Sequence, residues 1–211
     1  MNSYFYVAKV TDNKDEDNLN RVKVTTHLKE DTVSYWVPYL SCNAGEGIGF
    51  SSLPEIDDQV LVLSFGSSRE NQIVIGSFWN SNCKPPETKE NTDADLNGDG
   101  KNNLSFFKSK KESMVIFDDT DSKEKMQFIV SGGKSRIELD NENELINIET
   151  DKDFNMSAKG AVSIKTEKEF TVSAKKACHF KCDNFGAKAS KGANVEASKD
   201  LTVKGSGIAL N

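Results

Sequence analysis

A repeat of eight residues, which begins at Ile146, constrains the fold more than any other feature of this sequence. Apolar or small residues fill its first, third and fifth positions, and charged or turn-forming residues fill the last three, as in Asp151-Lys152-Asp153. The first positions are Ile146, Phe154, Val162, Phe170, Cys178, Phe185, Ala193 and Leu201, with one seven-residue step before Phe185. The pattern predicts short strands separated by corners.

Side chains at positions one, three and five lie on one side of a strand, because successive side chains alternate between its two faces. A stripe this narrow cannot form a core by itself, and a corner every eight residues is too tight for a filled single-chain coil. We therefore expect three identical chains to wind about one axis as an intertwined triangular β-helix. The predicted trimer core comprises Ile146, Ile148, Phe154, Met156, Val162, Ile164, Phe170, Val172, Phe180, Val195, Leu201 and Val203.

The remainder of the chain also has the pattern of an all-β protein. Residues 1–82 contain short apolar segments separated by turn residues, which predict a small barrel of the OB type. The expected strands are Tyr4–Val10, Arg21–Thr26, Val33–Val37, Gln59–Phe65 and Gln72–Phe78. Residues 106–145 resume the alternation and predict a β-meander that leads into the octad-repeat needle at 146–211, with turns near 118–122, 131–134 and 140–143.

A polar segment at 83–105, rich in Pro, Asn, Asp and Gly, is interpreted as a linker. Within it, Asp93, Asp95, Asn97 and Asp99 resemble the start of a calcium-binding loop. The twelfth position of such a loop should be a bidentate carboxylate, but it is Leu104 or Phe106 in the two registers. A solvated linker and a calcium loop both remain open here.

Composition excludes several functional classes. No apolar stretch approaches the length of a membrane helix, and we see no secretory leader, so we expect synthesis in the cytoplasm. Cys42, Cys83, Cys178 and Cys182 have no paired spacing, which favours reduced thiols, and the last two fall on the inward stripe. The two histidines, His27 and His179, have no nucleophile pattern beside them, so we expect no enzymatic activity and no cofactor.

Charge is distributed unevenly along the chain. Residues 1–145 carry 16 basic and 25 acidic side chains, whereas residues 146–211 carry 11 and 8. The acidic barrel argues against nucleic-acid binding, and we expect its aromatic residues Tyr35, Trp36, Phe78 and Trp79 to pack or to meet neighbours. The mildly basic needle is compatible with contact to anionic lipid or with ordinary solvated corners.

Several barrel segments resemble the OB domain of VgrG-type and phage baseplate spike proteins. They are Asn20–Val24, Trp36–Pro38, Ala44–Phe50, Pro54–Val62 and Ile75–Asn80, in the same order and spacing. Residues 113–120 and 135–140 resemble the start of that family's triangular β-helix. The resemblance implies a homotrimeric central spike of a contractile injection system that docks on a hub ring and is driven through a membrane.

Two departures from the family refine this expectation. The chain is too short to include fused hub domains, which implies a separate hub protein, and it has no inserted lysozyme-like module. The last residues, Ser206, Gly207, Ile208, Ala209, Leu210 and Asn211, lack the His-x-His pair that binds iron at some spike tips, which implies a cap of the PAAR-repeat type.

Three hypotheses about function follow. The first is a structural spike of a phage tail, tailocin, extracellular injection particle or type VI-like system. The second is a trimeric receptor- or glycan-binding tail fibre with the same β-helix as a stalk. The third is a polysaccharide-degrading tailspike, which would need a longer coil and an acidic groove.

Overall fold

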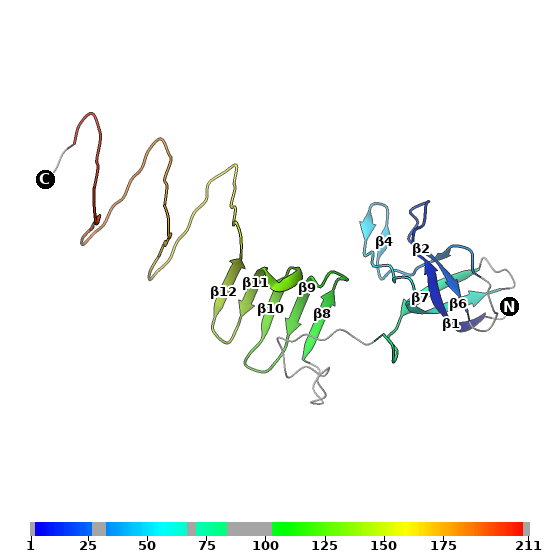
Figure 1. Cartoon of the computed structure of the whole chain (residues 1–211). Coiled ribbons are helices and arrows are strands. Elements are labelled where there is room, and N and C mark those ends of the chain that lie inside the picture. The colour runs from blue at the N-terminus through cyan, green and yellow to red at the C-terminus, as the bar shows by residue number, and fades with distance from the viewer. Residues whose placement is uncertain (1–2, 27–32, 67–70, 84–102, 209–211) are drawn as a thin grey trace. The chain divides into compact units, whose positions relative to one another are not determined.

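The computed structural model describes residues 3–26, 33–66, 71–83 and 103–208. The chain divides into two units, residues 1–155 and 156–211, and the first contains a barrel and a five-stranded meander (Figure 1). Strands make up nearly all the regular structure of the described residues, and the one helical element among them is a 3-10 turn, η2 (Ser131–Gly133). The all-β class predicted from the sequence is confirmed.

The barrel is built on one sheet with the strand order β3-β2-β1-β6-β7. Its strands are β1 (Ser3–Asp12), β2 (Arg21–Thr25), β3 (Val37–Pro38), β6 (Gln59–Phe65) and β7 (Gln72–Ser77), and all neighbours are antiparallel. The two edges meet at a parallel bridge between Tyr39 and Val74, where the N–H of Leu40 donates to the carbonyl of Val74 at 2.8 Å. This contact nearly closes the barrel, so little edge is left unpaired.

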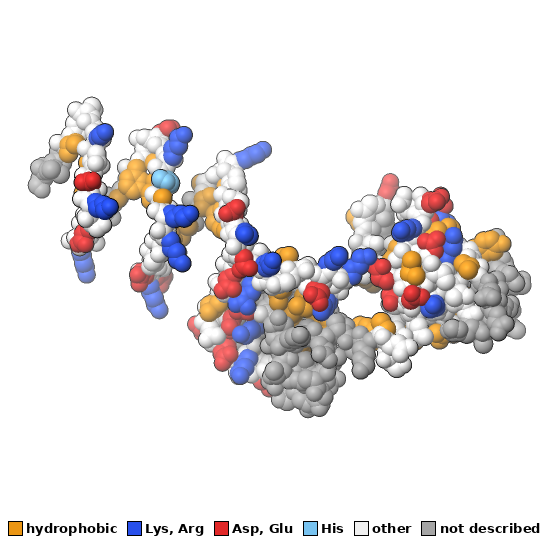
Figure 2. Space-filling view, viewed as in Figure 1, with side chains coloured by type: hydrophobic (Ala, Val, Ile, Leu, Met, Phe, Trp, Pro, Cys, Tyr) orange, Lys and Arg blue, Asp and Glu red, His pale blue; other side chains and the backbone are white. Residues whose placement is uncertain are grey.

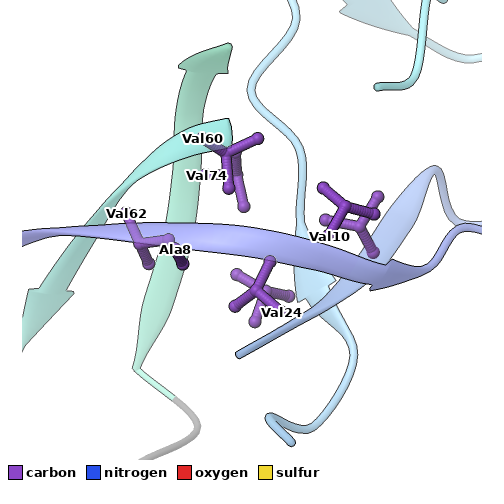
Figure 3. Packing of buried hydrophobic residues seen from close by; sticks show 8 residues of the cluster. Ala8, Val10, Val24, Val60, Val62 and Val74 are labelled. Carbon is purple, nitrogen blue, oxygen red and sulfur yellow. The ribbon is translucent and has the colours of Figure 1, made fainter. Parts of the chain in front are cut away.

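The barrel core consists almost entirely of valine. One face of β1, β2 and β6 supplies most of it, because alternate residues of these strands point inward (Figure 3). The buried cluster is Ala8, Val10, Val22, Val24, Val37, Val60, Val62 and Val74, with Tyr6, Tyr39 and Leu53 packed against it. β-Branched side chains fit a strongly curved sheet well, which explains how so small a domain forms a core within one chain.

The predicted strand Val33–Val37 is shorter than expected. Val33 forms only an isolated bridge with Thr25, and β3 begins at Val37. The reason lies in Ser34, whose hydroxyl accepts the N–H of Val24 at 2.8 Å and so replaces a backbone partner in the ladder. A side chain that competes for backbone hydrogen bonds interrupts a strand in a way that apolar alternation does not reveal.

A hairpin follows β3 and was not among the strands expected from the alternation. It consists of β4 (Ala44–Gly45) and β5 (Ile48–Gly49). Gly49 has a φ of 150°, and a Cβ atom there would lie 2.7 Å from the carbonyl oxygen of Asn43, so the position requires glycine. The two-residue strands are too short to show a period-two pattern.

The meander is a second antiparallel sheet with strands in sequence order. It comprises β8 (Leu104–Lys108), β9 (Met114–Asp118), β10 (Lys125–Ile129), β11 (Ser135–Asp140) and β12 (Leu145–Thr150). The turns between its last four strands coincide with the turn signals at 118–122, 131–134 and 140–143. These strands lie side by side as one sheet (Figure 1).

The second unit contains no strand pairing in its described residues, 156–208. From residue 151 onward, bends recur at 151–152, 159–160, 167–168, 175–176, 183, 190–191, 198–199 and 206. Figure 1 shows the segments between these bends as long, nearly straight runs. The bends fall on the predicted corners of the octads, including the shortened unit around Asp183, so the backbone follows the eight-residue period of the sequence.

Candidate self-association surface

One face of the meander is apolar over β9 to β12, and in β8 it carries Phe107 and the polar Ser105. Its strand registers pair Phe117 with Met126, Met126 with Leu139, and Leu139 with Ile146, and paired residues of antiparallel strands lie on the same face. A second row runs beside the first. This apolar face comprises Phe107, Val115, Phe117, Met126, Phe128, Ile137, Leu139, Ile146 and Ile148.

These side chains are largely open to solvent in the single chain. Phe117 is 46 % exposed, Phe128 42 % and Ile146 72 %. A soluble monomer rarely leaves so many large apolar residues together on its surface, and contiguous exposed patches of this kind mark sites of association. The apolar face is therefore a candidate interface.

The opposite face of the meander carries ionic and polar pairs. Lys125 contacts Asp140 at 3.0 Å, and the amide of Gln127 donates to Glu138 at 2.6 Å. Hydrogen bonds from Asn143 and the ammonium of Lys125 lower the pKa of Asp140 to about 2, and the same contact with Asp140 raises the pKa of Lys125. This second face, called the polar face, also carries Ile116 and Ile129, which are buried within the chain, whereas most of the apolar face is exposed.

A groove of about 470 Å³ opens where the chain leaves the meander. Phe128, Ile137 and Ile148 of the apolar face line it together with Phe154, the first inward residue of the following octad. Phe154 therefore lies beside the apolar face of the meander.

The inward positions of the octads have no core within their own chain. Every described residue from 151 to 208 is exposed, and Phe170 and Val172 expose 61 % and 60 % of their surface. Orange apolar side chains follow the coil along its length in Figure 2. Of the twelve predicted core residues, Ile146 and Ile148 lie in β12 on the apolar face, and the other ten lie in the open coil.

The backbone N–H and C=O groups of the coil also lack backbone partners within the described chain. Within the described residues, the last backbone hydrogen bond between chain segments joins Asp151 N–H to the carbonyl of Lys134 at 2.9 Å. Beyond it, the described N–H and C=O groups have no backbone partner in the chain. Extended segments with a free apolar stripe and free backbone groups form a template for pairing with other chains.

The remaining candidate residues take positions that follow from the octads. Cys178 and Cys182 are free thiols, exposed like the rest of the stripe, and the rings of Phe180 and Phe185 lie 5.7 Å apart. His179 is exposed at an outward position. Among the described residues, no group of three or more His, Cys, Asp or Glu side chains is arranged to hold a metal.

Some predicted positions lie outside the described residues. They are the calcium-loop candidates Asp93, Asp95, Asn97 and Asp99, the histidine His27, and Ala209, Leu210 and Asn211 of the proposed tip. Ser206, Gly207 and Ile208 are described and exposed. No helix of the described chain is long and apolar enough to cross a membrane.

Sequence reasoning missed most of the apolar face as an interface. The alternation over residues 106–145 predicts the strands, but β9 is apolar on both faces and its pattern does not say which face is shared. The register decides this: Val115 and Phe117 lie beside the apolar residues of β10, while Ile116 lies beside Gln127 on the polar face. An alternation count over all five strands together would have found the shared face.

The barrel has an apolar strip of its own on the outside. Phe5 pairs with Leu63 and Val7 with Leu61 on the outer face of β1 and β6, and Phe5 is 61 % exposed. Of the four aromatic residues expected to pack or meet neighbours, Tyr35, Phe78 and Trp79 are exposed in the single chain. The ring of Trp36 instead lies beneath a cation, with Lys23 Nζ at 4.5 Å from its centre.

A charged cluster holds the loop between β1 and β2. The Arg21 guanidinium donates to Asp15 through Nε at 2.8 Å and Nη2 at 2.6 Å, and Asp15 also accepts the N–H of Leu19 at 3.0 Å. These contacts, led by that of Arg21, hold the pKa of Asp15 well below its usual range. Every ionic partner in this cluster is supplied by the chain, so the cluster has a structural role.

The comparison with known families bears on the barrel. Residues 6–79 match the model of the type VI secretion system/phage-baseplate injector OB domain. The barrel belongs to this family. The resemblance of the barrel to the OB domain of VgrG-type and phage baseplate spike proteins is thereby confirmed, and the matched residues run from within β1 to just beyond β7. No curated protein matched the chain.

The matched domain suggests a coarse, spike-related structural role. Its members are structural components of baseplates and injectors, and the domain identifies a part related to the central spike of a phage-tail-like particle. The injector OB domain accounts for the first third of the chain, and the meander and octads lie beyond the matched residues.

Proposed function

We propose that the chain is the non-enzymatic central spike of a contractile phage-tail-like machine, in which three copies join their octads into a rigid needle that pierces the target membrane. The observation that carries this proposal is the open stripe of the octads: residues 151–208 are regularly bent, apolar on the inward positions and without a core of their own. The injector OB domain at 6–79 supplies the link to a contractile machine.

Three copies can bury the inward stripe of the octads, whereas one or two copies leave it partly exposed. In a triangular β-helix each octad forms one side of a three-sided prism, and each corner coincides with one of the observed bends. The free N–H and C=O groups then pair with strands of the other chains above and below. If each octad advances one layer, eight octads make a needle of roughly 40 Å.

In this proposal the meander surrounds the same threefold axis as the needle. Its apolar face adjoins Phe154 at the groove, and three meanders would enclose Phe117, Phe128 and their neighbours around the axis. Its polar face, with the Lys125–Asp140 ion pair, would then face solvent. A rod held by many interchain hydrogen bonds resists bending, because a bend breaks several bonds together.

The barrel is the end that binds the machine. We assign the hub as a separate protein, and the exposed apolar strip at Phe5 and Val7 supports a protein partner for the barrel. We assign the exposed residues 206–208 as a contact for a PAAR-type tip protein. Nucleic acid is not a partner in this proposal, since the barrel is acidic.

The second candidate function is a trimeric tail fibre that binds a receptor or glycan, with the octads as its stalk. The same stripe would favour a trimer in that role. Glycan-array binding and a hydrolysis assay separate the two: a spike binds and cleaves no glycan, whereas a fibre or tailspike does one or both.

The decisive test is the location and stoichiometry of the chain. Light scattering of the purified protein is expected to give three times the chain mass of 23.3 kDa. Labelled chain in intact particles is expected on the particle axis at the baseplate, with octads pointing away from the tail. A monomer in solution, or a label at the particle periphery, would contradict the proposal.

A further inference from the structure

We propose that residues 170–192 form a basic belt that binds the phosphate headgroups of an anionic membrane. The belt is defined by Lys175, Lys176, Lys181, Lys188 and Lys191, against which stands a single acidic residue, Asp183. This inference rests on the proposed spike, because the needle brings the belt to a lipid surface.

Other lysines at the same corners provide an internal comparison. Lys152 lies between Asp151 and Asp153, and Lys168 lies between Glu167 and Glu169, so each is compensated by its neighbours. Lys176 and Lys191 occupy the same seventh position of their octads, yet they have no acidic neighbour. Compensated lysines are enough to keep a corner solvated, so solvation alone does not explain the excess charge of the belt.

All five lysines point away from the inward stripe. Lys181 and Lys188 stand at the fourth, outward position of their octads, and the other three stand at corners. Each is exposed, and none makes an ion pair within the described chain. Blue side chains project from the edges of the coil in Figure 2. The belt charges therefore remain available to a partner.

The lysines of the belt lie close together along the axis. The belt spans three octads, which is roughly 14 Å along a needle that advances one strand spacing per octad. Lysines of adjacent octads are separated along the axis by less than the Debye length of about 8 Å at physiological salt, so they reinforce one another. Three copies around the axis triple the charge and present it in every direction.

The chemistry favours a membrane over other anionic partners. Lysine is a flexible point charge that suits a diffuse layer of phosphates, whereas a specific phosphate site is usually built from arginine forks or backbone N–H groups. The only aromatic ring at an outward position of the belt is the imidazole of His179, since Phe180 and Phe185 belong to the inward stripe, so the belt lacks the series of stacking rings that single-stranded nucleic acid requires. The chain as a whole carries a net charge of −6, so attraction must be local to the belt.

The experiment is co-sedimentation of the full-length protein with vesicles. Vesicles of phosphatidylcholine with phosphatidylglycerol are compared with vesicles of phosphatidylcholine alone, at low and high salt. Binding is expected only to the anionic vesicles and is expected to fall with salt. The double substitution Lys175→Ser and Lys176→Ser is expected to lower the partition coefficient about tenfold, since each surface lysine near an anionic leaflet contributes several-fold.

The matched control is Lys152→Ser with Lys168→Ser, which removes the same charge from compensated corners. This variant is expected to bind within about twofold of the unmodified protein. Equal losses in the two double variants would show that net charge matters and the belt does not. A soluble polyphosphate that competes as well as vesicles do, at the same phosphate concentration, would also overturn a membrane-specific belt.

Light scattering of every variant separates this inference from the proposed function. A trimer that binds no anionic vesicles refutes the belt and leaves the spike in place. A monomeric unmodified protein refutes the spike itself.

Discussion

The barrel and the octad coil use similar residues and reach opposite states in the single chain. In the barrel, eight inward side chains, seven of them valine, form one buried cluster. In the coil, inward side chains such as Phe170 and Val172 remain more than half exposed. The apolar content of a segment therefore does not decide whether it has a core within its own chain.

The difference lies in geometry. The barrel sheet curves until the chain beyond β3 meets β7, so the inward faces of one chain enclose a volume. The coil turns every eight residues and never returns to pair with itself in the described residues. Its stripe has the composition of a core that nothing in the described chain covers, and the proposed trimer would cover it with the stripes of two other chains.

The largest effect that tests this comparison is a charge on the inward stripe. Phe170→Asp is expected to abolish the trimer, because three carboxylates would meet on one axis without partners, at a cost of several kcal/mol each. Light scattering would report a fall from three chain masses to one, or aggregation. Thr171→Asp, in the same octad at an outward position, is the control and should remain trimeric. An undisturbed trimer in the Phe170 variant would refute the shared core.

The second prediction concerns the core that the chain builds alone. Val62→Ala removes a fully buried side chain from the barrel and is expected to lower its free energy of unfolding by about 2 kcal/mol. Both tryptophans, Trp36 and Trp79, lie in the barrel sequence, so tryptophan fluorescence in denaturant follows this domain. The trimer mass should not change. The control, Val7→Ala on the outer face of β1, should cost much less, and equal losses would contradict the assigned faces.

A third, smaller effect sharpens the contrast between the two faces of the meander. Because the pKa of Asp140 is lowered to about 2, this carboxylate stabilises the folded chain above the unfolded pKa of roughly 4. The contribution is lost as the pH falls from about 4 through 2. Asp140→Asn should lower the melting temperature near neutral pH and flatten its dependence on pH in that window. A variant with an unchanged acid profile would show that the pair with Lys125 contributes nothing.

The smallest effect is expected at the edge of the same sheet. Arg136 contacts Glu149 at 2.8 Å between two exposed side chains, and such pairs are screened by water and salt. Glu149→Gln should leave the trimer mass unchanged and the melting temperature nearly so. A large loss would mean that Glu149 contacts something outside its own chain.

Local patterns predicted much of this fold. The strand Gln59–Phe65 and the corners of the octads follow from side-chain alternation and turn chemistry, which depend only on neighbours in sequence. The hairpin at Ala44–Gly49 and the interruption at Ser34 could not be predicted, because a two-residue strand has no period and a hydroxyl can replace a backbone partner. The apolar face was missed because β9 is apolar on both sides.

By itself, the sequence determined which positions are inward, outward or at corners, since the period of a strand is a property of the backbone and the placement of turn residues. It also determined the family of the barrel, whose residues 6–79 match the injector OB domain. Only the tertiary structure decided which inward residues are buried within the chain. Burial depends on whether distant strands return to enclose a volume, and that happens where β3 reaches β7 but nowhere in the described coil.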